Sequence, residues 1–341
     1  QPPRVALQNG SGAAPAVTVV WTTKGKAGTS LVWAKSGDGG RTFSASALVP
    51  GTDAPGNRGW EGLGLGPGGR MFSVWLDHRK LAAPQQTQMN AEHHHESSAS
   101  APPPAAAGAP KDGVAMAQLS QLYVASLDGA VAPVAVTGGV CYCCKTGVVA
   151  SGDDVLAVWR HVYPGNLRDI AFAASRDRGR TFAAPVRVSE DHWMIDGCPE
   201  NGPTVTVAGA AVHVIWPTVV AGSGAGEPTM ALFHAVTTDH RTFCSRNRVP
   251  TEGATPKHPR ATTLTDGRVA VVWDEGVSGR RQVVLGRKGR RPGDVFDRTV
   301  LPDYDFAQYP AVAALPEGGL VVAWASGVAE RTVVHVARMG R

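Results

Sequence analysis

The sequence lacks the features that mark several protein classes. No apolar run approaches the roughly 18 residues that a membrane-spanning helix needs. No stretch shows sustained helical periodicity, so helices should be few. The chain also lacks a strong excess of charge of one sign, because the net charge is +5 and the arginines are scattered. We therefore expect neither a membrane span nor a nucleic-acid partner.

The composition instead favours strands and turns. The 341 residues are 43% hydrophobic and include 41 glycines and 25 prolines. Runs of valine and alanine are short and end at these turn-forming residues, which is typical of an all-β protein. The first residues, Gln1-Pro2-Pro3-Arg4, lack the charged and apolar regions of a secretory signal peptide. We therefore expect that a signal peptide, where one existed, has been removed.

An internal repeat organises the whole chain. Six apolar runs end in tryptophan, at Trp21, Trp75, Trp159, Trp216, Trp273 and Trp324. They recur at intervals of about 55 residues, apart from one interval of about 84, and such periods are typical of β-propellers. A stretch rich in His, Ala and Pro, residues 81–117, accounts for the longer interval, and we expect it to be a flexible insertion in blade two.

Each tryptophan is followed by a loop, a further strand, a turn and usually a short fourth strand, which is the meander of a propeller blade. We predict a single six-bladed propeller over residues 1–341. Its blades should span approximately 4–50, 58–138, 143–190, 200–250, 257–302 and 307–341. The first innermost strand should be Arg4–Leu7. The last blade shows three clear strands, so either its fourth strand is absent or the chain has been trimmed.

Two turns carry a recognisable motif. Ser36, Asp38, Gly40, Thr42 and Phe43, and likewise Ser175, Asp177, Gly179, Thr181 and Phe182, match the Asp-box pattern S-x-D-x-G-x-T-[WF], and a shortened version lies at Asp239 to Phe243. With the tryptophan repeat, these residues resemble the bacterial neuraminidase repeat family of sialidase-like propellers across nearly the whole chain. The resemblance implies that the Asp boxes are structural and lie on the face opposite the sialidase active site.

The tryptophans also serve as a ruler for the functional face. The residue fifteen positions before each of the last five marks the start of an innermost strand, near the propeller axis, where ligands usually bind. This ruler selects Trp60, Cys144, Asn201, His258 and Tyr309, and the neighbouring positions add Arg58, Glu61, Cys143 and Arg260. Cys141 and Cys198 occupy equivalent places, eighteen positions before their tryptophans, in adjacent blades. The loops after two tryptophans should add Met89, His93, His94, His95, His161 and Arg168 to this face.

These residue types favour a soft metal ion, because thiolate, thioether and imidazole together suit Cu(I), with Zn(II) next. The candidate ligands are Cys141, Cys143, Cys144, Cys198, His258, His93, His94, His95 and Met89. We interpret the chain as an exported copper-binding protein, periplasmic or secreted, acting as a carrier or as a redox enzyme. Other interpretations stay open, since the three histidines could be a solvated loop and Cys141 could form a disulfide with Cys198.

A sialidase-type glycoside hydrolase is the alternative. The resemblance implies three arginines that grip a carboxylate, a tyrosine nucleophile with a glutamate, and an acid/base aspartate. Tyr309, Glu61 and Arg260 are the candidate catalytic residues, and Trp60, Arg58, His161, Arg168 and Asn201 are the candidate substrate-binding residues. The chain departs from the pattern, because it lacks an Arg-Ile-Pro motif in blade one and an evident acid/base loop. A third possibility is a propeller that only binds a glycan or a protein, and under every interpretation we expect a monomer.

Overall fold

The computed structural model describes residues 3–8, 14–66, 69–81, 113–195, 197, 199–220, 227–291, 293–302 and 306–340. The candidate ligands Met89, His93, His94, His95 and Cys198 lie outside these residues, as does most of the predicted insertion. The described part of that insertion ends in a short helix, α2 (Gly113–Leu119). No helix among the described residues is long and apolar enough to cross a bilayer.

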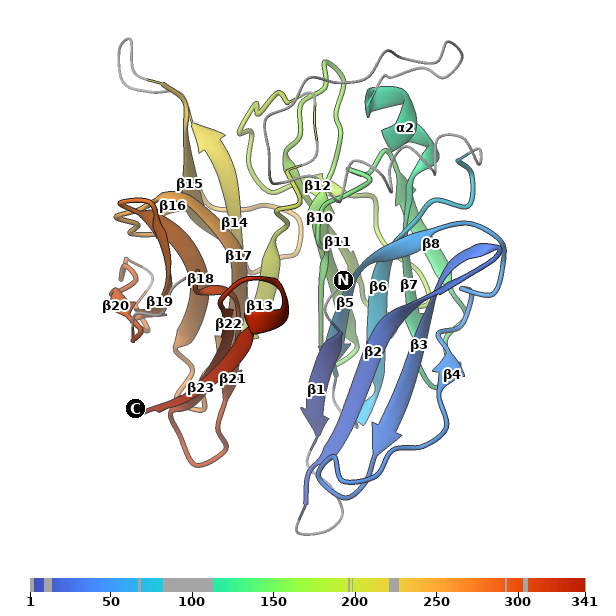
Figure 1. Ribbon diagram of the computed structural model, residues 1–341. Helices are drawn as coiled ribbons and strands as arrows, with labels where there is room; N and C mark the ends of the chain where they lie inside the picture. Colours follow the sequence, from blue (N-terminus) through green and yellow to red (C-terminus); the bar gives the residue numbers. More distant parts are fainter. Residues whose placement is uncertain are drawn as a thin grey trace.

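The strands form six antiparallel sheets in chain order, which confirms the predicted all-β propeller (Figure 1). Blade one comprises β1 (Arg4–Gln8), β2 (Ala16–Gly25), β3 (Gly28–Ser36) and β4 (Ala47–Leu48). Blade two comprises β5 (Arg58–Leu65), β6 (Met71–Asp77), β7 (Gln121–Ser126) and β8 (Val134–Gly138). Blade three comprises β9 (Gly147–Ser151), β10 (Asp154–Arg160), β11 (Ile170–Ser175) and β12 (Val186–Arg187).

The second half of the chain repeats this arrangement. Blade four comprises β13 (Thr204–Ala208), β14 (Ala211–Val220), β15 (Thr229–Thr237) and β16 (Asn247–Arg248). Blade five comprises β17 (Ala254–Thr263), β18 (Val269–Val277), β19 (Arg280–Lys288) and β20 (Thr299–Val300). Blade six has three strands in the described residues, β21 (Gln308–Ala314), β22 (Leu320–Ser326) and β23 (Val333–Met339), with a 3-10 turn, η2 (Ala329–Arg331), before the last.

The repeated tryptophans form the cores between blades. Trp75, Trp159, Trp216 and Trp273 are fully buried, and Trp324 is nearly so. A buried indole N–H needs an acceptor. In three blades the side chain two residues further on supplies it: the indoles of Trp75, Trp159 and Trp273 donate to Asp77, His161 and Glu275 at 3.1, 3.4 and 2.8 Å. The position two residues after these tryptophans is therefore polar, although Asp77 and Glu275 are buried.

The turns at Asp38, Asp177 and Asp239 share one hydrogen-bond pattern. One carboxylate oxygen of Asp38 accepts backbone N–H groups of residues 41 and 42 at 2.9 Å, and the other accepts the Thr42 hydroxyl at 2.6 Å. These bonds hold the pKa of Asp38 well below its ordinary value, with the Thr42 hydroxyl as the largest cause. Asp177 and Asp239 bond Thr181 and Thr242 in the same way, so the turns close without any ligand.

The ring of blades has a seam between blade six and blade one. Along the axis β1 packs against β5, β5 against β9, β9 against β13, β13 against β17, and β17 against β21. Among the described residues, β21 does not pack against β1 in this way. The side chains of β1 that point away from blade two are accordingly exposed, Val5 by 59% and Leu7 by 53%. Trp21 is only half-buried, unlike the other core tryptophans.

Candidate functional site

The ruler positions coincide with a repeated backbone feature. Trp60, His258 and Tyr309 have φ of 54°, 54° and 55°, the left-handed conformation that bulky side chains rarely adopt. Each lies inside a β-bulge, because the register of β5, β17 and β21 against the next strand shifts at that point. Such bulges often re-aim side chains beside functional sites. In three blades the ruler residue therefore lies in a β-bulge with a left-handed backbone conformation.

A hydrogen-bond network fixes His258 beside Tyr309. The Nδ1 atom of His258 lies 2.7 Å from Oδ1 of the fully buried Asp274, and the other Asp274 oxygen accepts Arg281 Nε at 2.8 Å. The Tyr309 backbone N–H also donates to Asp274, at 3.2 Å. The two rings then lie with centroids 4.2 Å apart. Burial lowers the pKa of His258, although the Asp274 carboxylate acts against this, so the imidazole is neutral near pH 7.

Lys145 brings an ammonium group to the same place. Its Nζ lies 4.9 Å from the centre of the Tyr309 ring, within cation–π range, and 3.6 Å from a Glu200 oxygen. Gly202 allows this position, since a Cβ there would collide with the Lys145 carbonyl group. Burial lowers the pKa of Lys145 to about 8. Because this pKa still lies above neutral pH, the group beside the tyrosine ring stays mostly an ammonium.

Glu61 and two arginines complete the inner layer. Glu61 is fully buried, and neither of its carboxylate oxygens has a hydrogen-bond partner among the described residues. Arg4 of blade one donates to the Glu61 carbonyl oxygen at 2.8 Å, and Glu61 attracts both Arg4 and Arg260. Burial lowers the pKa of Arg260, with the charge of Arg4 adding to the effect. We call Glu61, Lys145, His258, Arg260 and Tyr309 the axial cluster.

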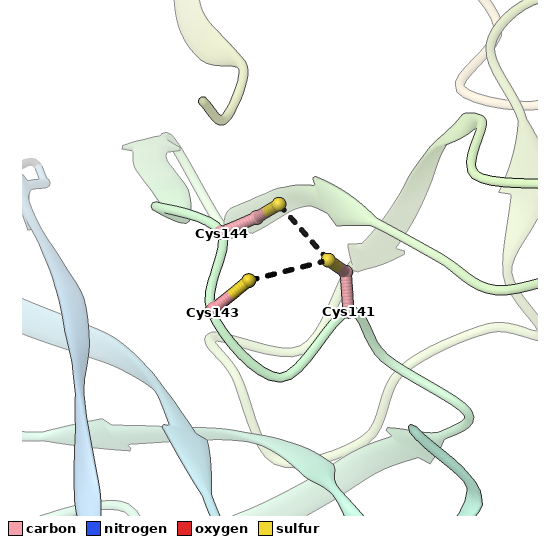
Figure 2. Close-up of side chains that lie close together, drawn as sticks. All are labelled: Cys141, Cys143 and Cys144. Carbon is pink, nitrogen blue, oxygen red and sulfur yellow. Dashed lines mark hydrogen bonds between the residues drawn. The ribbon is translucent and has the colours of Figure 1, made fainter. Parts of the chain in front are cut away.

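The cysteine loop, residues 141–144, lies directly before Lys145. Its three sulfurs are buried and converge, as Figure 2 shows. The Sγ atoms of Cys141 and Cys144 are 3.0 Å apart, and those of Cys141 and Cys143 are 3.9 Å apart. Cys141 and Cys144 are free thiols, whereas Cys143 is disulfide-bonded. The loop is held at both ends, by the Cys141 N–H bonded to the Arg160 carbonyl and the Thr146 N–H bonded to the Trp60 carbonyl.

Positive charge surrounds the free sulfurs. Arg168 Nη1 donates to Cys141 Sγ at 3.6 Å, and Arg168 Nη2 is buried without a hydrogen-bond partner among the described residues. A hydrogen bond from Cys144, with Arg168 and Arg160 nearby, lowers the pKa of Cys141 to about 6 against the effect of burial. Burial and the neighbouring Cys141 raise the pKa of Cys144. The pair therefore carries one thiolate and one thiol near neutral pH.

The loop has the donors for a soft metal ion. A metal with bonds of about 2.3 Å to sulfur at a tetrahedral angle needs sulfurs about 3.8 Å apart. The Cys141 and Cys143 sulfurs already have this spacing, whereas the Cys141 and Cys144 sulfurs lie closer together, at 3.0 Å. Cys143 can supply a thiolate only after its disulfide is reduced. Among the described residues, the group of ligand atoms that converge here comprises the three cysteines and does not include His258.

The remaining predicted site residues have other contacts. Arg58 is buried, and its guanidinium bonds Asp77 at 3.0 Å and the Gly56 carbonyl at 2.9 Å. The side chain of Asn201 is buried and accepts the His258 backbone N–H at 3.4 Å, which ties blade four to blade five. His161 packs edge-on to Tyr163, and burial lowers its pKa to about 4. Trp60 packs edge-on to His78.

Sequence reasoning missed Lys145, Asp274 and Arg4. Lys145 directly follows Cys144, the ruler position of blade three, and this neighbouring position was the signal that could have identified it. Asp274 directly follows Trp273, whereas the other acidic side chains of this kind, Asp77 and Glu275, lie two positions after a tryptophan. Arg4 was expected only as the start of the first innermost strand, and its bond to the Glu61 carbonyl depends on the packing of β1 against β5 of the next blade, which no local pattern encodes.

Solved structures share this fold. A Hadza microbial sialidase superposes with a TM-score of 0.56 at 13% identity, covering 98% of this chain and 65% of that one. A family 93 α-L-arabinofuranosidase of Fusarium graminearum in complex with arabinobiose has a TM-score of 0.56 at 10% identity, covering 99% and 92%. A protein of unknown function from Dyadobacter fermentans has a TM-score of 0.54 at 14% identity, covering 98% and 92%.

At these identities the likeness concerns the fold alone. The chain spans about two thirds of the length of the sialidase (65%). No family model matches the sequence, and no curated protein matches it.

Proposed function

We propose that the cysteine loop binds one soft metal ion, with Cu(I) the best match and Zn(II) the next. The observation that carries this proposal is the pair of free, buried sulfurs of Cys141 and Cys144, 3.0 Å apart, with a third sulfur within 4 Å of Cys141. Two cysteines separated by two residues form a natural chelate, and thiolates prefer Cu(I) over harder ions.

The surrounding charge supports a monovalent ion. Cu(I) held by two thiolates leaves one net negative charge in a buried place, which needs a partner. Arg168 contacts Cys141 and has a second nitrogen, Nη2, without a partner among the described residues. Arg160 lies nearby and packs its guanidinium over the Trp193 ring at 4.6 Å. These cations neutralise a bis-thiolate copper(I) complex.

The proposal extends to the role and the compartment. All three sulfurs are at most 1% exposed, so a substrate has no direct path to the metal through the described residues. This burial favours a copper carrier over an oxidase. The disulfide at Cys143 supports an oxidising compartment, periplasmic or extracellular, because cytosolic thiols are kept reduced.

Anaerobic titration tests the metal site. Protein purified without an affinity tag is titrated with Cu(I) against a chromophoric copper(I) chelator, and with Zn(II) in a second series. We expect one Cu(I) per chain and a loss of affinity of at least about 100-fold in the C141S/C144S double variant. The matched control is Cys244→Ser, because Cys244 is free, exposed and in blade four. Equal affinity in the double variant and in the control would exclude this site.

A glycoside hydrolase activity at the axial cluster is the second candidate. The observation that favours it is the set of a partly exposed Tyr309 (43%), a buried Glu61 whose carboxylate has no hydrogen-bond partner among the described residues, and the half-buried Arg260, on a fold shared with a sialidase and an arabinofuranosidase. Hydrolysis of fluorogenic sialosides and arabinofuranosides tests it. Activity that disappears in Tyr309→Phe and persists in C141S/C144S would establish it, and no turnover of either substrate would exclude it.

A further inference from the structure

A cavity lies on the opposite face from the axial cluster, between blades four and five. It has a volume of about 720 Å³ and is lined by the β13–β14, β15–β16, β17–β18 and β19–β20 turns. In an antiparallel meander these turns lie at one end and the β14–β15 and β18–β19 loops at the other. The volume lies within the range of small-molecule sites, which is about 300–1,000 Å³.

The charge of the lining is strongly positive. Four cations, Lys288, Arg248, Arg290 and Arg291, line the cavity with a single carboxylate, Asp294. Asp294 accepts the Arg291 backbone N–H at 2.9 Å and fits over Gly289, where a Cβ would collide with it. Asp266, next to the lining residue Gly267, pairs with Arg268 at 2.7 Å, and the charge of Arg290 contributes to lowering the pKa of Asp266. Mutually repelling cations in one cavity indicate an anionic ligand.

Lys288 is the buried member of this set. Only 7% of the residue is exposed, and its ammonium group donates one hydrogen bond, to the Arg291 carbonyl oxygen at 2.9 Å. An ammonium group has three N–H donors, so two remain for a ligand. Burying an ammonium without a counter-ion is unfavourable, and an oxyanion in the cavity removes that cost.

Two histidines form a wall of the cavity. The rings of His213 and His234 stack with centroids 5.1 Å apart, and His213 Nδ1 lies 2.9 Å from His234 Nε2. Burial, with the charge of Lys288, lowers the pKa of His213 to about 4. Phe296 packs edge-on to His234 at 5.3 Å. This wall is uncharged and flat, which suits a ring attached to the anionic group.

We infer that this cavity binds a small phosphorylated or sulfated ligand, with its oxyanion at Lys288 and the rim arginines and its ring against the His213–His234 wall. The site is independent of the proposed metal site, since it lies in other blades and on the other face. Phosphate and sulfate esters share the chemistry that the cavity recognises, so the two classes are separated by experiment.

Calorimetric titration of the full chain tests the inference. The probes are pyrophosphate and glucose 6-phosphate in one arm and glucose 6-sulfate in the other, at two salt concentrations. We expect saturable binding of one ligand per chain, weakened at least about tenfold in Lys288→Met. The matched control is Arg41→Gln, because Arg41 is an exposed arginine on the corresponding turn of blade one.

The outcomes are decisive in both directions. Binding that is lost in Lys288→Met and unchanged in Arg41→Gln supports the site. Whether the phosphate or the sulfate probe binds then identifies the class of ester. Absence of saturable binding in both arms overturns it, as does equal weakening in both variants, which indicates non-specific attraction. Should thermal melting show that Lys288→Met is misfolded, Arg290→Gln on the exposed rim replaces it, with an expected loss of at least about threefold.

Discussion

Asp77 connects two arginines and a tryptophan inside blade two. Its carboxylate accepts Arg58 Nε at 3.0 Å, Arg79 Nη2 at 2.7 Å and the Trp75 indole N–H at 3.1 Å. Burial acts to raise the pKa of Asp77, but the hydrogen bonds from Arg79 and the charge of Arg58 outweigh it and place the pKa below its ordinary value. The side chain therefore holds the end of β6 in place.

We predict that Asp77→Asn lowers the free energy of unfolding at pH 7 by about 3–5 kcal/mol, because it leaves the buried Arg58 without its counter-ion. Urea unfolding measures this. In the wild type the pKa of Asp77 is lower in the folded than in the unfolded chain. The contribution of Asp77 to the free energy of unfolding is thus present above about pH 4. It is lost as the pH falls through the pKa that Asp77 has in the folded chain. The difference between wild type and variant should shrink accordingly in acid.

An exposed ion pair provides the control for that measurement. Asp153 pairs with Arg178 at 2.7 Å, but the two side chains are 61% and 58% exposed. We expect Asp153→Asn to change the free energy of unfolding by less than about 1 kcal/mol. A similar loss in both variants would mean that Asp77 does not act through its buried pair.

At the scale of elements, the cysteine loop combines a disulfide with two free thiols. We predict that reduction of the Cys143 disulfide tightens Cu(I) binding by at least about tenfold, because it releases a third thiolate 3.9 Å from Cys141. The titration is performed on oxidised protein and on protein reduced and freed of reductant. Cys143→Ser should show no such response. A response of equal size in that variant would assign the effect to another group.

The β18–β19 turn offers a test of local backbone chemistry. Ser278 and Gly279 connect the paired residues Val277 and Arg280, and both have positive φ, of 49° and 79°. Asn-Gly is the preferred pair for such a two-residue turn. We expect Ser278→Asn to raise the free energy of unfolding by about 0.5–1 kcal/mol, measured in urea. Ser278→Val should lower it, and the reverse order would contradict the assigned turn.

The elements were more predictable than the site. The tryptophan ruler identified the bulged positions Trp60, His258 and Tyr309 because every blade repeats one spacing, and spacing is a sequence property. The same ruler proposed Arg58 as a substrate-binding residue. It could not reveal that the Arg58 guanidinium forms an ion pair with Asp77, because the two residues lie on different strands, β5 and β6. The redox states of the cysteines were open for the same reason, because spacing determines chain neighbours and not bonds.

At the scale of the whole molecule, closure distinguishes this propeller. Blade six has three strands in the described residues, and β23 exposes Val334 by 70% and Val336 by 68%. Exposed valines on an outer strand and on β1 are surfaces that a closed ring would cover. Sequence could count the strands of each blade, but the seam depends on whether the first and last blades meet, which no local pattern encodes.

The seam leads to a prediction about local stability. β19 and β23 are both the third strand from the axis, but β19 pairs with β18 and β20, whereas β23 pairs only with β22 among the described strands. We expect backbone amides of β23 that bond β22 to exchange at least about ten times faster than those of β19 that bond β18. Hydrogen–deuterium exchange read by mass spectrometry compares the two strands within one sample. Equal protection would mean that the ring closes in solution and buries the valines of β1 and β23.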